Sequence, residues 1–359
     1  MNNRLDHLRE ICEQTQVDGF LISSTSNIFY ISGFNRFLVD HDGFLLVTNK
    51  STYLITSPLY TEAARKFTPD LAVLETSPDV WYAQMVKKIV TQENLKVIGF
   101  EEKDLRVAEY YDLQDEKVQL KSVSLRNLRL QKDADEIAAI QKACELTDVV
   151  FKKTIPFLKE GVSELEISAK MTAIAQDIGA DIGFPSIVAF GRHSAVPHHM
   201  TSDEKLTKNS FVLLDFGLKY NNYLSDMSRT VFFGSPTDNQ RTLYETVKKS
   251  QQAAAGYIQN HMSEDILVKD VDKIARDVLE EKHFPVYPHA LGHGVALEVH
   301  EAPTLSLYSP EKLLENTVFT LEPGTYDPTM GGVRIEDVYV LHNKKLQQLT
   351  NSSKDLIVI

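Results

Sequence analysis

Residues 209–217 read NSFVLLDFG and residues 316–324 read NTVFTLEPG, so one pattern occurs twice in the chain. In each segment an apolar run ends at an acid, Asp215 or Glu322, and a glycine follows two residues later. The apolar run predicts a buried β-strand, and the glycine predicts a turn after the acid. The repeat therefore predicts two related strands that each present a carboxylate at their end.

Each of these segments is followed by a second predicted strand that carries its own acid. Asp226 lies within YLSDMSRTVFF, residues 223–233, and Glu336 lies within VRIEDVYV, residues 333–340. The sequence thus predicts two hairpins with two carboxylates each, at positions that otherwise predict burial. Ionised carboxylates without partners are too costly to keep in an apolar interior. A pair of divalent cations would compensate all of them at once.

The composition is that of an ordinary globular protein, with 43% apolar and 25% charged residues. A total of 38 basic and 50 acidic side chains gives a net charge of −12, which argues against nucleic-acid or membrane partners. Only Cys12 and Cys144 are present, which excludes a disulfide framework and favours a reducing compartment. The N-terminal segment is charged where a signal peptide is apolar, and no apolar run approaches the ~20 residues of a membrane span. We therefore expect a cytoplasmic protein.

The first third of the chain alternates helix and strand signals. Leu5, Leu8 and Cys12 have helical spacing, and short apolar runs follow at residues 20–22, 44–47, 53–55 and 97–100. This pattern predicts a compact α/β domain over residues 1–126. The segment 125–132 is the expected junction with the rest of the chain.

Residues 127–359 are predicted to form a second domain that contains two halves of similar plan. A helix is expected to begin at Asp133, with Glu136 as its capping-box partner, and another at Ser163 with Glu166. In each half, helices are followed by a short strand with histidines and then by a hairpin with two acids. This duplication favours a site between the halves.

Histidines cluster in the same two regions. Of 11 histidines, three lie in residues 191–199 and three in residues 289–300. Taken singly, a histidine in a loop is usually solvated, and Asp226 could form a structural ion pair with Arg229. Together, carboxylates and imidazoles make an oxygen-rich donor set that suits Mn²⁺, with Fe²⁺, Co²⁺ or Zn²⁺ as alternatives. Two such ions share a water and lower its pKa, which favours metal-assisted hydrolysis.

The motifs around these residues occur together over nearly the whole chain. The segment NIFYISGF covers residues 27–34, DFG and YLSDMSRT contain Asp215 and Asp226, GHG contains His293, and EPG and GVRIED contain Glu322 and Glu336. In these motifs the chain resembles the creatinase/aminopeptidase family of pita-bread, M24-type metallopeptidases, and in particular its Xaa-Pro peptidases. The resemblance implies an α/β (α+β) fold, in which a creatinase-like N-terminal domain precedes a pita-bread domain with a pseudo-twofold repeat.

The resemblance also implies a set of metal ligands. Asp215 is expected to bind one of two divalent ions, and His293 and Glu322 the other. Asp226 and Glu336 are expected to bridge the two ions. Mn²⁺ is the expected metal.

Further roles follow from the same resemblance. Glu322 is expected to accept the proton of a metal-bridged water or hydroxide as it attacks the scissile carbonyl. His198 and His300 match residues that contact the substrate and stabilise the tetrahedral intermediate. His289 matches a residue that lines the pocket for proline, and Arg334, in the substrate-binding set, is expected to orient the carboxylate of Glu336 from the same strand face.

Three positions depart from the family pattern. His193 stands where asparagine is usual, Ala296 stands where glycine is usual, and Lys132 follows Gln131 in an unusual junction sequence. None of them is an expected metal ligand. The first two could change the shape of the substrate pocket.

The sequence leaves several functions open. The leading interpretation is an aminopeptidase P-like enzyme that acts on short peptides with proline at the second position, and the alternative is a prolidase restricted to Xaa-Pro dipeptides. Methionine aminopeptidase shares the metal set but not the N-terminal domain, and creatinase-like hydrolases lack the full set. A non-catalytic peptide-binding module would have lost metal ligands that this chain keeps. A homodimer is expected by analogy with the family.

Overall fold

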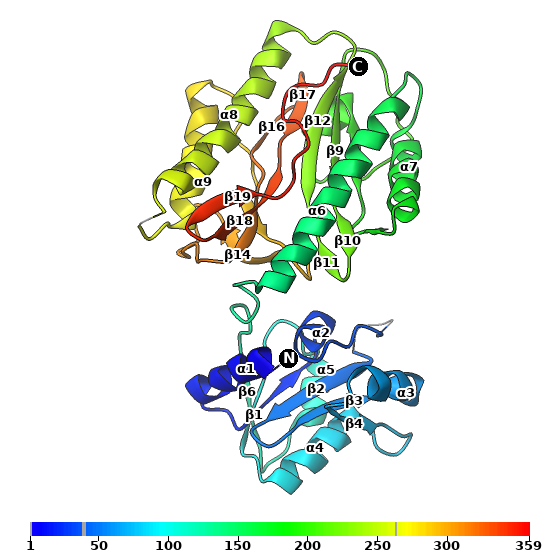
Figure 1. Ribbon diagram of the computed structural model, residues 1–359, viewed down its shortest axis with the longest axis vertical. Coiled ribbons are helices and arrows are strands. Elements are labelled where there is room, and N and C mark those ends of the chain that lie inside the picture. Colours follow the sequence, from blue (N-terminus) through cyan, green and yellow to red (C-terminus); the bar gives the residue numbers. More distant parts are fainter. Residues whose placement is uncertain (1, 38–40, 263) are drawn as a thin grey trace. The chain divides into compact units, whose positions relative to one another are not determined.

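The computed structural model describes residues 2–37, 41–262 and 264–359. The chain divides into two compact units, Met1–Leu128 and Arg129–Ile359. Each unit combines helices with β-sheet (Figure 1), so the predicted mixed α/β character is confirmed.

The first unit is built on a six-stranded sheet with the order β4-β3-β2-β1-β5-β6. Its strands are β1 (Gly19–Ile22), β2 (Gly43–Thr48), β3 (Thr52–Thr56), β4 (Ala72–Glu75), β5 (Val97–Glu101) and β6 (Gln119–Val123). Its helices are α1 (Asn2–Thr15), α2 (Thr25–Ser32), α3 (Pro58–Phe67), α4 (Tyr82–Glu93) and α5 (Val107–Leu113). Strand β1 is antiparallel to β2 and parallel to β5.

The predicted strands of this unit are confirmed as β1, β2, β3 and β5, while β4 and β6 were not predicted. Both missed strands lie at the edges of the sheet, and their side chains are mostly exposed or half-buried. An edge strand needs few apolar residues because one of its sides has no strand neighbour. The apolar signal that identifies the inner strands is therefore weak there.

The second unit contains several sheets flanked by two helix pairs. Its first half comprises α6 (Ala134–Thr154), η1 (Ile155–Phe157), α7 (Glu164–Asp177), β7 (Asp181–Ile182), β8 (Ile187–Phe190), η2 (Gly191–Ala195), β9 (Ser210–Phe216), β10 (Leu218–Tyr220), β11 (Tyr223–Leu224) and β12 (Met227–Phe233). Its second half comprises α8 (Asp238–Asn260), α9 (Val268–Glu281), β13 (Gly292–Gly294), β14 (Glu301–Leu305), β15 (Val318–Leu321), β16 (Gly324–Asp327), β17 (Gly331–Arg334), β18 (Asp337–His342) and β19 (Lys345–Gln348). Helices α6 and α7 lie on one side of the sheets, and α8 and α9 lie on the other (Figure 1).

The two halves use the same strand plan. In the first half the order is β12-β9-β8, and in the second β15 lies between β13 and β18. Strand β9 pairs antiparallel with β12 as predicted, and β15 pairs antiparallel with β18. An apolar core under α8 and α9 includes Phe211, Phe232 and Phe319.

Both predicted capping boxes are confirmed. Asp133 accepts a hydrogen bond from the backbone N–H of Glu136 (2.8 Å), and Glu136 accepts one from the N–H of Asp133 (3.0 Å). Ser163 and Glu166 make the same reciprocal pair at the start of α7, at 3.1 and 2.7 Å. Such pairs satisfy backbone donors that a helix leaves free at its start.

The positions of two acids differ from the sequence prediction. Asp226 and Glu336 were expected within strands, but Asp226 precedes β12 and Glu336 lies between β17 and β18. The backbone N–H of Glu336 donates to the carbonyl of Ser228 (3.1 Å), which joins the two halves. Because the chain leaves regular strand geometry at these points, both carboxylates can turn toward one centre.

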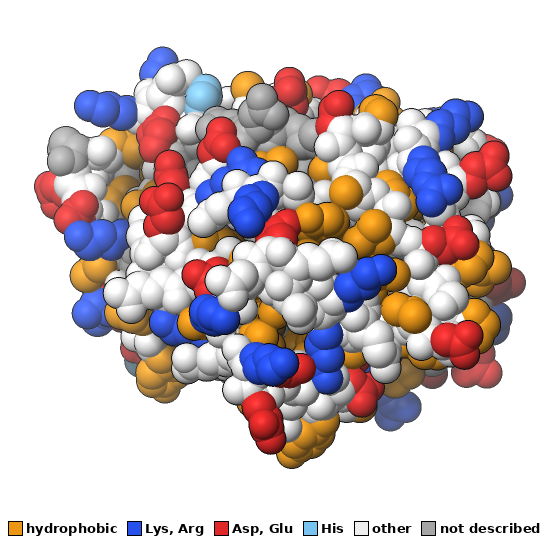
Figure 2. Space-filling view, turned by 90° about the horizontal axis from the view of Figure 1, so that it is seen from below, with side chains coloured by type: hydrophobic (Ala, Val, Ile, Leu, Met, Phe, Trp, Pro, Cys, Tyr) orange, Lys and Arg blue, Asp and Glu red, His pale blue; other side chains and the backbone are white. Residues whose placement is uncertain are grey.

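Other expectations concern the surface and the cysteines. Cys12 and Cys144 are both free and buried. Acidic and basic side chains are interspersed over the face drawn in Figure 2. Among the helices of the described residues, none is both long and apolar enough to cross a membrane.

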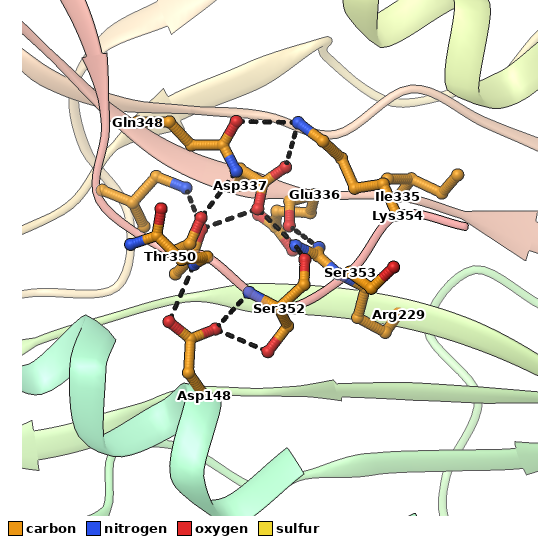
Figure 3. Close-up of polar contacts among 12 residues, drawn as sticks. Asp148, Arg229, Ile335, Glu336, Asp337, Gln348, Thr350, Ser352, Ser353 and Lys354 are labelled. Carbon is orange, nitrogen blue, oxygen red and sulfur yellow. Dashed lines mark hydrogen bonds and ion pairs between the residues drawn. The ribbon is translucent and has the colours of Figure 1, made fainter. Parts of the chain in front are cut away.

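A buried ion pair lies next to Glu336, and one of its members is the following residue, Asp337 (Figure 3). Arg229, only 1% exposed, donates from Nη2 to Oδ1 of Asp337 at 2.5 Å and to the carbonyl of Ser352 at 2.9 Å. Its Nη1 donates to the carbonyl of Glu336 at 2.5 Å. Hydrogen bonds from the guanidinium thus connect β12 to the segment that contains Glu336.

The partner carboxylate is fully engaged as well. Asp337 also accepts from Thr350 Oγ1 (2.8 Å) and Gln251 Nε2 (3.0 Å), and Lys354 Nζ lies 3.0 Å from its Oδ2. In this part of the fold the buried charges are compensated within the chain. The pair Arg229 and Asp337 therefore fixes the C-terminal residues against β12.

We expect the substitution Asp337→Ala to lower the free energy of unfolding by about 3–5 kcal/mol, because it leaves the Arg229 guanidinium buried without its carboxylate. Denaturant unfolding of the variant measures the loss. Asp277→Ala, which breaks the exposed pair with Lys273, is the matched control and should cause a far smaller change. Equal effects of the two substitutions would contradict the structural role of the buried pair.

Candidate metal centre

The five predicted metal ligands come from both halves of the second unit. Asp215 lies near the end of β9, and Asp226 directly precedes β12. His293 is the middle residue of β13, Glu322 directly follows β15, and Glu336 lies between β17 and β18. Electrostatic interactions link each of the four acids to the others, so the structure brings the two hairpins together at one centre.

The distances at this centre are short enough for a shared cation. His293 Nε2 lies 3.7 Å from Asp226 Oδ2 and 3.4 Å from Glu322 Oε1. One ligand atom each from Asp226, His293 and Glu336 all lie within 4.8 Å of one another. A single metal ion can be reached by all three from such positions.

Two oxygen atoms at the centre are orphaned. Asp226 is 4% exposed and Glu336 is 2% exposed. Asp226 Oδ1 and Glu336 Oε1 are buried, and no hydrogen-bond donor for them is present in the described part of the chain. Buried carboxylate oxygens are normally satisfied, so these two fit a role as ligands of a cation.

The electrostatics favour the same assignment. Burial, together with repulsion from the neighbouring acids, raises the pKa of Asp226 and Glu322 well above the usual range. For Glu336 the same causes, burial and then Asp215, raise the pKa to about 8. Burial and the nearby His300 lower the pKa of His293 to about 3, so its imidazole is neutral and able to bind a metal. The residues therefore fit divalent cations, whose charge would stabilise the ionised acids.

Arg334 connects the centre to its surroundings. Its Nη2 donates to Asp215 Oδ2, its Nη1 donates to Tyr326 Oη (2.8 Å), and its Nε donates to Ser228 Oγ (2.8 Å). Ser228 Oγ in turn donates to Glu336 Oε2 (2.8 Å). The sequence predicts that Arg334 orients the carboxylate of Glu336 from the same strand face. In the structure β17 ends at Arg334, and hydrogen bonds through Ser228 link the two side chains.

His289 is held rigidly beside the centre. Its Nε2 lies 2.8 Å from Tyr326 Oη, its Nδ1 lies 2.7 Å from the carbonyl of Ala290, and its ring stacks on Tyr287 at 5.1 Å between centroids. Its Nδ1 also lies 4.0 Å from Glu322 Oε2. Burial lowers the pKa of His289 to about 4, which keeps the imidazole uncharged.

His198 and His300 border the centre with exposed side chains. The ring of His300 meets the ring of His293 edge-on, with centroids 4.4 Å apart. Partial desolvation of the ring and the proximity of His198 lower the pKa of His300, and His198 also interacts electrostatically with His289. All the histidines predicted for the site are therefore gathered around it.

Sequence reasoning missed several side chains that support the site. Tyr326 contacts both His289 and Arg334, and Ser228 connects Arg334 to Glu336. Neither residue type has a spacing that marks it in the sequence. Ser228 could have been suggested by its position two residues after Asp226, on the strand that carries the hairpin.

Comparisons with known proteins identify the family of the chain. The model of metallopeptidase family M24 matches residues 138–343, and that of the creatinase/prolidase N-terminal domain matches residues 4–131. A protein of Pyrococcus horikoshii named Xaa-Pro dipeptidase is 32% identical, over 99% of both chains. Among solved structures, an Xaa-Pro dipeptidase from Bacillus anthracis superposes with a TM-score of 0.91 at 29% identity, over 99% of both chains. An X-Pro aminopeptidase from Thermotoga maritima gives a TM-score of 0.86 at 30% identity, over 96% of this chain and 98% of that one.

These matches extend over both domains of the chain. They confirm the predicted arrangement of a smaller N-terminal domain and a C-terminal pita-bread domain. They also confirm the resemblance stated from the sequence motifs.

We expect the metal-free protein to become less stable as the pH rises from about 6.5 to about 8. Below this range the lowered pKa values of His289 and His293 act in the opposite direction, because the unfolded state binds protons that the folded imidazoles do not. Glu336 has a pKa near 4.5 when unfolded and about 8 when folded, so the folded state binds more protons in this window. Asp226 and Glu322 add to the effect in the same direction. Denaturant unfolding in EDTA at several pH values measures the slope.

Glu336→Gln is the control for this experiment, because the amide mimics the protonated acid. It should flatten the decline, and saturating Mn²⁺ should abolish it in the unsubstituted protein. Stability that rises with pH in the metal-free protein would contradict the electrostatic account.

Proposed function

The chain belongs to metallopeptidase family M24, and from this premise we propose that it hydrolyses the bond between an N-terminal residue and a following proline in short peptides. The observation that carries the proposal is the convergence of Asp215, Asp226, His293, Glu322 and Glu336 at one buried centre. The names of the relatives supply the substrate class. Proteins similar to this chain over 96–99% of its length are named Xaa-Pro dipeptidase or X-Pro aminopeptidase.

We propose that the five converging residues hold two divalent ions. Asp215 would bind the first ion, and His293 and Glu322 would bind the second. Asp226 and Glu336 would bind both ions. The oxygen-rich donor set favours Mn²⁺, with Co²⁺, Zn²⁺ or Fe²⁺ as alternatives. When bound, two such ions would lower the pKa of a shared water toward neutrality.

We assign the remaining roles to the side chains around this centre. Glu322 accepts the proton of the attacking water. His198 and His300, whose side chains are exposed beside the centre, bind the scissile carbonyl and stabilise the developing charge there. His289, fixed by Tyr326, lines the pocket for the proline side of the substrate.

Arg334 belongs to the proposed substrate-binding set through its effect on Asp215. Its guanidinium is buried and donates to that carboxylate and to the carbonyl of Pro197 at 3.2 Å. These bonds orient Asp215 and the segment that carries His198. Such indirect partners tune both metal affinity and geometry.

The wider organisation is part of the same proposal. Residues 1–126 would be the creatinase-like N-terminal domain and residues 127–359 the catalytic domain, and the protein would act as a homodimer. The free cysteines Cys12 and Cys144 support a cytoplasmic location.

A restricted dipeptidase is the second candidate function. The specific observation in its favour is that two of the similar proteins, from Pyrococcus horikoshii and Bacillus anthracis, are named Xaa-Pro dipeptidase. The aminopeptidase P-like interpretation is supported by the Thermotoga maritima structure.

The deciding experiment compares an Xaa-Pro dipeptide, an Xaa-Pro-Xaa tripeptide and a matched Xaa-Ala dipeptide, each with Mn²⁺ and with EDTA. We expect Mn²⁺-dependent cleavage of the proline peptides in preference to the alanine peptide. Cleavage of the tripeptide supports the aminopeptidase P-like activity, and cleavage of the dipeptide alone supports the dipeptidase. No cleavage of any proline peptide with Mn²⁺, Co²⁺, Zn²⁺ or Fe²⁺ would overturn the proposal.

We expect Asp226→Asn to lower kcat by about 10²-fold or more and to reduce the bound metal, because one carboxylate serves both ion positions. Metal analysis and steady-state kinetics measure the two effects. Asp181→Asn, which neutralises an exposed acid of the same half, is the matched control and should change neither. Near-normal turnover of Asp226→Asn would contradict the two-metal assignment.

A further inference from the structure

A second buried carboxylate lies outside the metal centre. Glu164, the first residue of α7, is fully buried. Its Oε1 lies 2.9 Å from His193 Nδ1 and accepts a hydrogen bond from the backbone N–H of Phe190 at 2.8 Å. Its Oε2 lies 2.8 Å from His199 Nε2 and accepts from both the N–H (2.9 Å) and the Oγ (2.7 Å) of Ser202.

All of these donors belong to one segment, residues 190–202, which we call the 190–202 loop. The loop leaves β8 at Phe190 and returns to the body of the domain at Ser202. The rings of His193 and His199 lie against each other, tilted by 31°, with their centroids 4.2 Å apart. His198, proposed above to contact the substrate, lies between the two clamped histidines in the chain.

The other side of the loop contacts the strand that leads to the metal centre. Ser194 Oγ accepts a hydrogen bond from the N–H of Gly332 (2.8 Å), and the carbonyl of Pro197 accepts one from Arg334 Nη1 (3.2 Å). A Cβ atom at position 332 would lie 2.0 Å from the carbonyl oxygen of Ser194, so only glycine permits this approach. The loop is therefore held between Glu164 and β17.

One alternative use of the cluster is a metal site, because ligand atoms of Glu164, His193 and His199 lie within 4.8 Å of one another. The contacts favour hydrogen bonding instead. Each imidazole nitrogen faces a different oxygen of the carboxylate at hydrogen-bond distance, and the rings are tilted by only 31°. Burial alone would raise the pKa of Glu164, but bonds from His199, Phe190, Ser202 and His193 outweigh it and lower the pKa. The ionised carboxylate is satisfied by donors from the chain itself.

We propose that Glu164, His193 and His199 are positioning residues that hold the 190–202 loop so that His198 faces the substrate beside the metal centre. The proposal rests on the function proposed above, because it gives His198 its role.

The test compares His199→Phe, His199→Gln, His198→Ala and the double variant His198→Ala/His199→Phe in the Mn²⁺-loaded protein. Phenylalanine keeps the ring but removes the Nε2 donor, whereas glutamine keeps a donor near the same position. We expect His199→Phe to lower kcat about tenfold with little change in KM and in metal content, because a displacement of about 1 Å is enough for such a loss. His199→Gln should retain most of the activity.

The double variant decides whether the clamp acts through His198. If it does, His199→Phe should have no further effect when His198 is already alanine. Independent, multiplicative losses in the double variant would overturn the proposal. So would a third equivalent of metal that is lost in His199→Phe, since that would identify the cluster as a metal site. His261→Phe, which replaces a histidine whose ring likewise lies against a neighbouring ring at the end of α8, is the matched control.

Hydrogen exchange gives a readout that does not depend on activity. His199→Phe should accelerate exchange of backbone amides in residues 190–202, and His199→Gln should restore their protection. Unchanged protection in His199→Phe would overturn the clamp whatever the kinetics. If instead the unsubstituted protein cleaves no proline peptide while the exchange results hold, the proposed function fails and the clamp stands as a structural device.

Discussion

Repulsion among four closely spaced carboxylates, two of them buried and two half-buried, is the constraint on which the rest of this structure depends. Asp215, Asp226, Glu322 and Glu336 interact electrostatically with one another at a single centre. A fold can hold such groups together only if its backbone is fixed by other interactions. Here the backbone bond from Glu336 to Ser228 and the side-chain bond between the same residues join the two hairpins. These bonds hold the carboxylates in place before any ion or substrate binds, so the site is preorganised.

Neighbouring residues in the chain illustrate how charge is divided between stability and function. Asp337 is neutralised by Arg229 and Lys354, whereas Glu336, the residue before it, keeps one oxygen without a donor among the described residues. One carboxylate therefore anchors the C-terminal segment, and the other is left available for a cation. Arg334 has both kinds of role, because it compensates the charge of Asp215 and also donates a hydrogen bond to the segment that contains Pro197.

The sequence predicted much of this arrangement because its signals are local. Apolar runs that end at acids located the hairpins, and capping boxes located the starts of α6 and α7. The edge strands β4 and β6 escaped detection because exposed strands need no apolar run. Tyr326 and Ser228 were not predicted because their partners, His289 and Glu336, are distant in the sequence and become neighbours only in the folded chain. Glu164 was hidden for a related reason: an acid in the first turn of a helix has an ordinary explanation as a favourable charge near the helix start.

The strand plan shared by the two halves has a consequence for the equivalence of the two proposed ion positions. Strand β8 occupies beside β9 the place that β13 occupies beside β15, yet β8 reads IVAF and β13 reads GHG. The imidazole of His293 consequently has no counterpart in β8. In the ligand assignment proposed above, two halves of the same strand plan would therefore present an asymmetric donor set, with a nitrogen donor at one position only. Two ions bound there would differ in affinity and in preferred metal, so loading would occur in two separable steps and mixed-metal forms could exist.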